Sequence, residues 1–412
     1  MSLLVQKYGG TSVADPQRIR HVARRVARTR RAGNDVIVVV SAMGKSTDDL
    51  ISLAHQVNHH PPAREMDMLL TAGERISMAL LAMALHREGT SALSLTGSQA
   101  GILTDAAHGE AKITEIRGTR VRDGLQDGKV VIVAGFQGVD PASKEVTTLG
   151  RGGSDATAVA LASAHRADIC EIYTDVNGIY TADPRVVSGA RKLDEVSFDE
   201  MLELAAGGAG VLMARSVEVG RRFGVPIHVR SSFAEDEGTW VKERTMEEAI
   251  IRGVAHDTSE AKVTIRGVPD RPGVAAALFE TLADARVNVD MIVQNVGEDG
   301  STDISFTVPQ SHADAASRAT DPLVEKLGAH GFAVDSEIAK VSLVGAGMKS
   351  SPGVAARVFR ALANARINIE MISTSPIRIS CVVRRECVEP AVRALHAEFD
   401  PPVITEEVGA DA

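Results

Sequence analysis

The first half of the chain alternates short apolar runs with segments of helical periodicity, and this alternation constrains the fold more than any other feature. The runs at residues 35–40 and 130–134 have the length and composition of buried strands. After residue 15, the apolar residues Ile19, Val22 and Val26 recur at helical spacing. Buried strands that alternate with helices imply a mainly parallel sheet with helices on both faces. The sequence therefore predicts an α/β fold for this half.

A glycine-rich stretch from Thr147 to Asp155, TTLGRGGSD, lies between an apolar run and an alanine-rich segment of helical pattern. Its three glycines let the backbone pass close to a ligand, and the N–H groups at the following helix start attract anions. Arg151 can grip a carboxylate or phosphate, Ser154 adds a hydroxyl, and Asp155 adds a carboxylate that can hold Mg²⁺. A glycine-rich turn with a capping side chain is the alternative, but such a turn needs neither the arginine nor three glycines. The stretch therefore indicates an anion site.

Further polar or glycine-rich loops follow other predicted strands, and they span residues 7–12, 41–47 and 174–180. In a parallel α/β sheet, ligands bind beyond the carboxyl ends of the strands, so these loops are expected to converge on one crevice. The second loop is not a Walker A motif, because Val39 stands where that motif needs its first glycine. No complete GxGxxG pattern is present, which argues against a dinucleotide-binding dehydrogenase.

Length, charge and cysteine content exclude several classes of protein. A chain of 412 residues is expected to hold two or three domains, and a net charge of −9 argues against a general binder of nucleic acid or anionic membranes. The three cysteines form no zinc-type spacing, which indicates reduced thiols. We expect no signal peptide, and no apolar run approaches the length needed to cross a bilayer. These observations predict a cytoplasmic protein.

The second half of the chain contains an internal repeat. The pentapeptide PGVAA begins at Pro272 and again at Pro352, and Asn288 matches Asn368 at the same offset. Each copy is predicted to contain a strand, a Pro-Gly helix start, an amphipathic helix and another strand. A purely structural duplication and a paired ligand sensor both remain open at this point.

With these motifs, the chain resembles the aspartokinase family over essentially its full length. The resemblance rests on a set of motifs that is specific as a whole: residues 7–12, 39–44, 73–75, 147–155 and 173–185. It implies an amino-acid-kinase domain with a mainly parallel sheet over residues 1–233, a linker over 234–259, and two ferredoxin-like βαββαβ ACT domains over 260–335 and 336–412.

The resemblance also implies an activity and its regulation. Family members use ATP and Mg²⁺ to phosphorylate the side-chain carboxylate of L-aspartate. The product, 4-phospho-L-aspartate, begins the route to lysine, threonine and methionine through the diaminopimelate pathway. We expect feedback inhibition by lysine and threonine, in a homo-oligomer or in an α₂β₂ assembly whose β subunit starts near Met246. A non-catalytic amino-acid sensor and another carboxylate kinase of the same superfamily are the alternatives.

Residue roles follow from the resemblance, position by position. The catalytic residues would be Lys7, Gly9, Gly10 and Asp155, of which Asp155 is also the candidate metal ligand. Aspartate would be bound by Ser41, Thr47, Glu74, Arg151, Gly152, Gly153 and Ser154, with Glu74 at its ammonium and Arg151 at a carboxylate. ATP would contact Lys7, Tyr8, Gly9, Gly10, Thr174, Asp175, Tyr180 and Arg185. The regulatory residues would be Asp270, Asn288, Asp290, Gln294, Asn368 and Glu370.

The chain departs from the family pattern at two positions that bear on ligands. Gly210 stands where the family commonly has a lysine near the nucleotide. Pro376 stands in the second ACT module where glutamate is usual, and a proline removes a backbone donor. We therefore expect altered inhibitor binding in that module.

Overall fold

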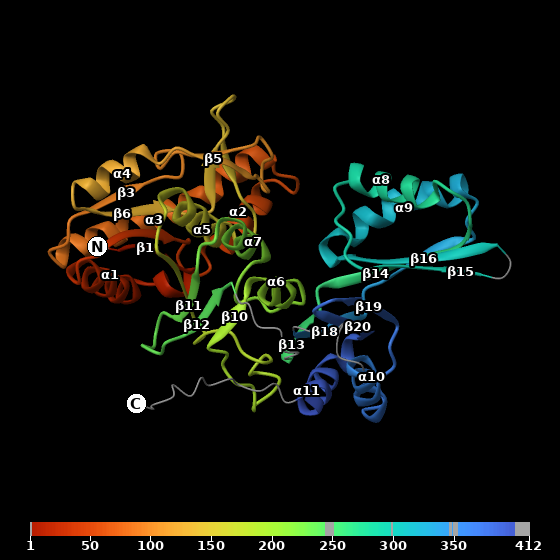
Figure 1. Ribbon diagram of the computed structural model, residues 1–412. Coiled ribbons are helices and arrows are strands. Elements are labelled where there is room, and N and C mark those ends of the chain that lie inside the picture. The colour runs from red at the N-terminus through yellow and green to blue at the C-terminus, as the bar shows by residue number, and fades with distance from the viewer. Residues whose placement is uncertain (1, 244–250, 298–299, 346–347, 349–352, 400–412) are drawn as a thin grey trace, which may run out of the picture. The chain divides into compact units, whose positions relative to one another are not determined.

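The computed structural model describes residues 2–243, 251–297, 300–345, 348 and 353–399. The chain forms two compact units (Figure 1). The N-terminal unit comprises Met1–Tyr180, Lys192–Ala205 and Gly210–Met246. The C-terminal unit comprises Thr181–Arg191, Ala206–Ala209 and Glu247–Ala412. The chain therefore leaves the N-terminal unit and returns to it before the C-terminal unit is completed.

An eight-stranded sheet forms the centre of the N-terminal unit, in the order β10-β12-β11-β9-β1-β2-β6-β3. Its strands are β1 (Leu3–Tyr8), β2 (Asp35–Val40), β3 (Ala92–Leu95), β6 (Val130–Ala134), β9 (Ile169–Thr174), β10 (Glu195–Ser197), β11 (Ile227–Ser231) and β12 (Thr239–Lys242). Neighbouring strands run parallel except β11 and β12, which are antiparallel. The predicted α/β fold with a mainly parallel sheet is thus confirmed.

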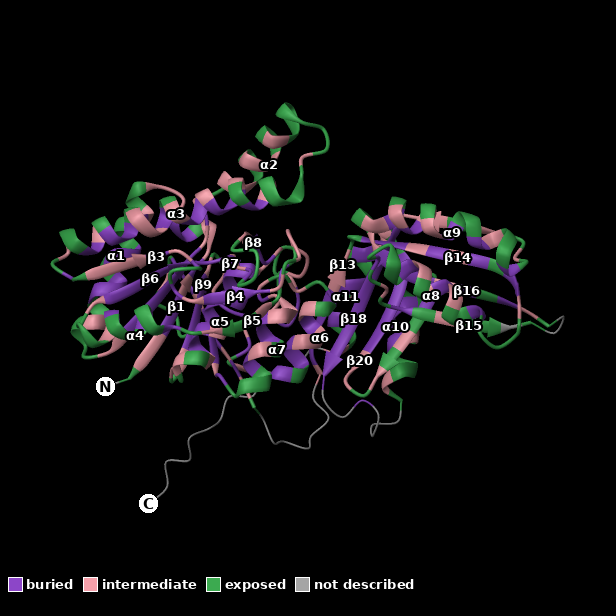
Figure 2. Ribbon diagram, turned by 90° about the horizontal axis from the view of Figure 1, so that it is seen from above, coloured by how far each residue is buried: buried purple, intermediate pink, exposed green. Residues whose placement is uncertain are grey.

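Helices cover both faces of this sheet, so its central strands are buried on both sides (Figure 2). The helices of the unit are α1 (Pro16–Arg31), α2 (Ser46–Val57), α3 (Ala63–Arg87), α4 (Thr119–Gln126), α5 (Gly153–His165), α6 (Phe198–Ala206) and α7 (Ala214–Phe223). Val36, Val38 and Val40 of β2 pack in one core cluster with residues of α1 and α3. Val39 points to the opposite face, where Ser154 of α5 lies close to it around Gly135. This alternation in β2 follows from the two-residue period of a strand.

The start of α1 shows why the local sequence forms a helix there. The Asp15 side chain accepts a hydrogen bond of 2.9 Å from the Arg18 N–H, and Pro16 takes the first helical position. Ile19, Val22 and Val26 are buried, as their spacing predicted.

A second, small sheet interrupts the expected path from β6 to the glycine-rich stretch. Its order is β5-β4-β7-β8, and its strands are β4 (Ile102–Thr104), β5 (Ile113–Ile116), β7 (Gln137–Val139) and β8 (Val146–Thr148). We did not predict these strands, because three or four residues are too few to show a periodicity. The sheet carries the chain to Leu149 and thereby positions the glycine-rich stretch.

Helix α3 is long and apolar enough, by length and composition alone, to cross a membrane, although Glu74 and Arg75 interrupt its apolar sequence. In the structure it packs against α1, β3, β6 and β8. Asp67, Thr71 and Glu74 lie buried along its inner face. We therefore assign α3 to the core of this unit.

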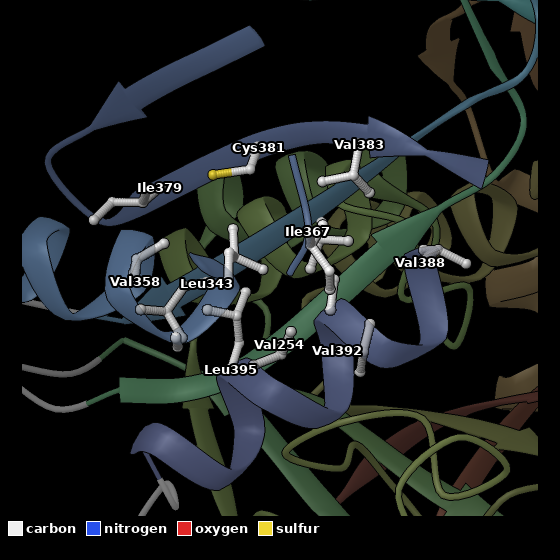
Figure 3. Packing of buried hydrophobic residues seen from close by; sticks show 14 of the residues in the cluster. Val254, Leu343, Val358, Ile367, Ile379, Cys381, Val383, Val388, Val392 and Leu395 are labelled. Atoms are coloured by element: carbon white, nitrogen blue, oxygen red, sulfur yellow. The ribbon is translucent and has the colours of Figure 1, made fainter. Parts of the chain in front are cut away.

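The C-terminal unit holds two four-stranded antiparallel sheets with two helices each. The first sheet, β15-β16-β14-β17, comprises β14 (Glu260–Pro269), β15 (Ile292–Val296), β16 (Ser301–Pro309) and β17 (Gly331–Asp335), with α8 (Val274–Asp284) and α9 (Ala313–Leu327). The second, β13-β18-β20-β19, comprises β13 (Ile251–Asp257), β18 (Ile338–Gly345), β19 (Met371–Ser375) and β20 (Arg378–Arg384), with α10 (Val354–Asn364) and α11 (Val388–Phe399). Figure 3 shows α10, α11 and the second sheet packed around residues such as Leu343, Val358 and Leu395.

The linker predicted for residues 234–259 needs correction, because two strands lie inside it. Strand β12 pairs with β10 and β11 in the N-terminal unit, and the Trp240 ring stacks on His228 at 3.9 Å. Strand β13 pairs with β18, so the second ACT module takes one strand from the chain that precedes the first module. Met246 lies outside the described residues.

Residues 181–191 form part of the C-terminal unit although they lie within the predicted kinase domain. The Thr181 carbonyl accepts a hydrogen bond of 2.8 Å from the Val254 N–H of β13. The Thr181 hydroxyl lies 2.9 Å from Nε2 of His396 in α11. Ala182 is buried in the core cluster of the second sheet. This segment is therefore a structural part of the second ACT module.

Candidate active site

A cavity of about 1080 Å³ opens in the N-terminal unit, at the carboxyl ends of β1 and β2 and at the start of α5. The predicted site residues that line it are Lys7, Gly10, Ser41, Thr47, Glu74, Arg151, Gly152, Gly153, Ser154 and Asp155. The expected convergence is thus confirmed for residues 7–12, 41–47 and 147–155. The cavity is of the size of a small-molecule site.

Lys7 and Asp155 form an ion pair at the floor of the cavity. The Lys7 Nζ lies 2.5 Å from Asp155 Oδ1, and the two side chains are only 12% and 8% exposed. Lys7 lies in β1, and Asp155 lies in the first turn of α5. Attraction between charges is stronger where water is largely excluded, so the pair holds the ammonium in a fixed position. An ammonium held at a helix start gives an anion two positive partners.

The loop after β1 is pressed against the loop after β2. The Gly44 N–H donates to the Gly10 carbonyl at 3.0 Å, and the Gly9 N–H donates to the Tyr173 carbonyl at 3.2 Å. A Cβ atom at Gly10 would lie 2.9 Å from the Ala42 carbonyl oxygen. Glycine at position 10 is therefore required by the close approach of two backbones.

Glu74 lines the cavity, and one of its two carboxylate oxygens has a hydrogen-bond partner. Its Oε1 accepts a hydrogen bond of 3.1 Å from the Ala42 N–H, and Oε2 is buried without a hydrogen-bond partner among the described residues. A Cβ at the neighbouring Gly73 would lie 2.7 Å from the Ala42 Cβ, so this glycine lets α3 approach the loop. Burial raises the pKa of the Glu74 carboxyl to about 7. The free oxygen is placed to receive a cationic ligand group, which would favour the ionised form.

The glycine-rich stretch turns sharply before α5. Gly150 and Gly152 have φ values of 73° and 68°, in the left-handed region that favours glycine. Arg151 between them is exposed and lines the cavity, whereas Ser154 is buried in the first turn of α5. The turn therefore presents an exposed cation and the N–H groups of a helix start to the same space.

The residues predicted to hold the nucleotide are arranged differently. Thr174, Asp175 and Tyr180 belong to the N-terminal unit but are absent from the described cavity lining, and Arg185 belongs to the C-terminal unit, where it pairs with Asp183 at 2.7 Å. The Tyr8 side chain is 0% exposed and stacks on Tyr173 with ring centroids 4.7 Å apart, so it belongs to the core. The contact of Tyr8 with ATP stays a prediction.

Several residues that line the cavity were not predicted from the sequence, namely Asp48, His55, His59, Asp67 and Phe136. Asp67 is 1% exposed and lies two helical turns before Glu74 on α3. An acid on the apolar face of a helical pattern, seven residues from another acid, was the available signal. The histidines gave no such signal, because they lie in or just after α2, a helix without buried residues.

The regulatory residues lie in the C-terminal unit, and two of them form ion pairs between its two ACT modules. The Lys262 Nζ pairs with Glu370, and the buried Lys340 Nζ pairs with Asp290 at 2.5 Å and with Glu260. Burial acts to lower the pKa of Lys340, but Glu260 and Asp290 outweigh it and raise that pKa. Ion pairs therefore connect the two modules, and Asp290 and Glu370 occupy equivalent positions of the repeat.

The two glycines that precede the repeated helices share one backbone conformation. Gly273 and Gly353 cap α8 and α10 with φ values of 95° and 97°. The other predicted regulatory residues, Asp270, Asn288, Gln294 and Asn368, are exposed. Ser350, Ser351 and Pro352 of the second loop lie outside the described residues.

Known proteins match this chain along both units. The amino acid kinase family model matches residues 2–231, and the ACT domain model matches residues 263–321 and 341–399. An aspartokinase of Mycolicibacterium smegmatis is 58% identical over 405 residues, which is 97% of this chain and 96% of the relative. An aspartokinase of Corynebacterium glutamicum is 56% identical over 409 residues, again 97% and 96% of the two chains.

Solved structures agree with these relatives. E. coli aspartokinase III in complex with aspartate and ADP matches with a TM-score of 0.84 at 27% identity, over 97% of this chain and 100% of that chain. The same enzyme in complex with lysine and aspartate matches with a TM-score of 0.73 at 27% identity, over 96% and 99%. Sequence motifs, cavity geometry and full-length similarity agree, and the chain belongs to the aspartokinase family.

Proposed function

We propose that the chain transfers the γ-phosphoryl group of ATP to the side-chain carboxylate of L-aspartate. A carboxylate oxygen attacks the γ-phosphorus, the bond to the bridging oxygen of ADP breaks, and 4-phospho-L-aspartate and ADP leave. The observation that carries the proposal is a single cavity that joins the Lys7–Asp155 pair to Glu74 and Arg151. These groups complement a phosphoryl group, an ammonium and a carboxylate.

The chemistry requires positioning and charge neutralisation more than proton transfer. The aspartate side chain is already ionised near neutral pH, so no general base is needed. Lys7 Nζ and the N–H groups of the glycine loop would hold the transferring phosphoryl group. The free oxygen of Glu74 would accept from the substrate ammonium, and Arg151 would hold its α-carboxylate. Holding the two reactants in line accounts for much of the rate acceleration in such reactions.

Mg²⁺ would enter this site with the nucleotide. No group of three or more His, Cys, Asp or Glu side chains that could hold a metal is found in the described part of the chain. Asp155 fits a magnesium ion that keeps most of its ligands as water and phosphate oxygens, which is usual for ATP-bound Mg²⁺. The ion would supply charge neutralisation on the phosphates, while Asp155 orients Lys7.

An assay of ADP release from the purified full-length chain tests the proposal. We expect ATP consumption that depends on both Mg²⁺ and aspartate, together with a hydroxylamine-reactive acyl phosphate. Glutamate and N-acetylglutamate serve as competing substrates in parallel reactions. Turnover with one of these and none with aspartate would identify another carboxylate kinase. No turnover with any of the three substrates would identify a non-catalytic amino-acid sensor.

We further propose that the ACT modules bind lysine or threonine and thereby inhibit the kinase. The related E. coli enzyme has been solved with lysine, which supports this choice of ligand. The loop before α8 offers helix-start N–H groups to a ligand carboxylate, and Asp270 stands exposed beside it. A ligand inhibits only by its differential affinity for a less active state.

Asp270→Ala is expected to relieve inhibition by about tenfold and to leave uninhibited turnover unchanged, because a lost charged contact costs about 1.5–3 kcal/mol. Inhibition curves with lysine, threonine and both together measure the effect. Asp284→Ala, at the other end of α8, is the matched control and should behave as wild type. Identical inhibition curves for wild type and Asp270→Ala would exclude this loop as the ligand site.

We propose an α₂β₂ assembly as the oligomer, with a β subunit that begins at or near Met246. A start there would include β13 and all later strands, so the shorter product would contain every strand of both ACT sheets. Intact-mass measurement of the complex purified from its natural source should show two chain lengths. Substituting Met246→Leu should abolish the shorter one. A single full-length mass in the unmodified complex would establish a homo-oligomer instead.

A further inference from the structure

Asp67 is a buried carboxylate that is held from several directions. Its side chain is 1% exposed. Oδ1 accepts hydrogen bonds from the Thr148 hydroxyl at 2.5 Å and the Gly109 N–H at 3.1 Å, and Oδ2 lies 2.7 Å from His108 Nδ1. Burying a carboxylate costs free energy unless several donors form hydrogen bonds with it. These partners belong to two segments: Thr148 lies in the glycine-rich stretch, and His108 and Gly109 lie in the loop between β4 and β5.

These two segments are joined beside the site. The Ala111 N–H donates to the Thr148 carbonyl at 2.9 Å. Two residues after Thr148, the backbone at Gly150 passes close to Gly109. A Cβ atom at position 150 would lie 3.1 Å from the Gly109 carbonyl oxygen. Asp67 therefore binds both segments, one through Gly109 and the other through Thr148. The turn that carries Arg151 begins where these two segments meet.

Arg215, in α7, binds the same two segments through their backbone carbonyl groups. Its Nη1 donates to the Leu149 carbonyl and its Nη2 to the Ala111 carbonyl, each at 2.8 Å. One guanidinium thus bridges both backbones with two directed bonds. Arg215 does not line the cavity in the part of the chain that the structure describes. It therefore acts on the site only through the segments that it bridges.

Asp67 and Glu74 lie seven residues apart on α3, which places them on one face, two turns apart. Both are buried and both line the cavity. Helix α3 thus carries one carboxylate for the substrate and another that locates the Arg151 turn. The distance between the ammonium partner and the carboxylate partner is set through a rigid helix.

We propose that Asp67 and Arg215 are positioning residues that fix Arg151 relative to Glu74 and so select a substrate of the length of aspartate. This inference rests on the proposed function, since it assigns Glu74 and Arg151 to the two ends of the amino acid. Neither residue takes part in phosphoryl transfer. Their loss therefore affects the binding of aspartate and its discrimination from glutamate more than the chemical step.

Arg215→Met tests the proposal most directly, because it removes both donors and keeps an apolar stem of similar length. We expect KM for aspartate to rise about tenfold, equivalent to about 1.4 kcal/mol, with KM for ATP unchanged and kcat within about threefold of wild type. The preference for aspartate over glutamate should fall in parallel. Arg215→Lys keeps one donor and should recover part of the loss. Arg222→Gln, on the same helix, is the matched control.

A double-variant cycle separates positioning from simple destabilisation. In an Arg151→Met background, Arg215→Met should raise KM for aspartate no further, because the side chain that it positions is gone. Multiplicative effects, or a lower melting temperature and kcat with unchanged KM, would overturn the proposal. Asp67→Asn, which turns a donor towards the Gly109 N–H, should raise KM in the same way if Arg215→Met does not fold. Loss of aspartate turnover in the wild type would instead refute the proposed function.

Discussion

Lys7→Ala is expected to lower kcat by roughly 10²–10³-fold while KM for aspartate changes little. Lys7 Nζ is held 2.5 Å from Asp155, and the two side chains are only 12% and 8% exposed. Negative charge accumulates on the phosphoryl oxygens as transfer proceeds, so a fixed ammonium stabilises the transition state more than the bound substrates. Steady-state kinetics with ATP and aspartate varied separately measure both constants. Lys129→Ala, a lysine paired with Asp127 on the surface, is the control.

The ion pair makes a second comparison informative. Because Lys7 and Asp155 act as a unit, adding Asp155→Ala to Lys7→Ala should reduce kcat much less than Asp155→Ala does alone. Equal kcat in Lys7→Ala and the wild type would remove Lys7 from the catalytic centre. Effects that multiply would show that the two side chains act independently.

Glu74→Gln is expected to raise KM for aspartate by roughly 10–100-fold, the size of a lost charged hydrogen bond, and to leave KM for ATP unchanged. The variant keeps the shape of the side chain and the bond from the Ala42 N–H but removes the charge that would receive the ammonium. Thr47 and Ser41 remain in place, so the cavity itself is preserved. A change in KM for ATP alone would contradict the assignment of Glu74.

The raised pKa of Glu74, about 7, makes the same residue a source of pH dependence. In the wild type, KM for aspartate should rise as the pH falls below about 7, because protonation removes the partner of the ammonium. The folded state binds this proton more tightly than the unfolded chain does. The wild type therefore loses stability as the pH rises from about 4.5 to about 7. Glu74→Gln should consequently raise the melting temperature at pH 8 and flatten the KM profile.

The central fold was predictable because its signals are local and strong. Ser197-Phe198-Asp199-Glu200 has the sequence pattern of a capping box, and the structure contains it at the start of α6. The Ser197 N–H donates to a Glu200 carboxylate oxygen, and the Glu200 N–H donates to the Ser197 hydroxyl. The amphipathic face of α8 also follows its sequence pattern, with Val274, Leu278 and Leu282 buried. Such features depend on residues within two helical turns, which a single sequence displays.

The errors concern pairings between distant segments. Nothing near β13 indicates that it pairs with β18, because the partner follows an entire ACT module. Tyr8 is a separate, local case: successive side chains of a strand point to opposite faces, so Lys7 lines the cavity while the Tyr8 side chain is buried. The role of Asp67 could not be predicted from the sequence, because its partners, Gly109 and Thr148, come together only in the folded chain.

The Thr181–Arg191 segment has a consequence for any regulatory subunit made from the same gene. A product that begins near Met246 contains both ACT sheets but lacks this segment, whose residues Ala182, Val186 and Val187 pack on the second core. With the segment it loses Thr181, the partner of the Val254 N–H and of His396. A short chain must therefore leave apolar surface uncovered that the long chain covers for itself. Long and short copies of the same sequence would differ in solubility as free proteins, and the short copy has the stronger physical reason to stay in a complex.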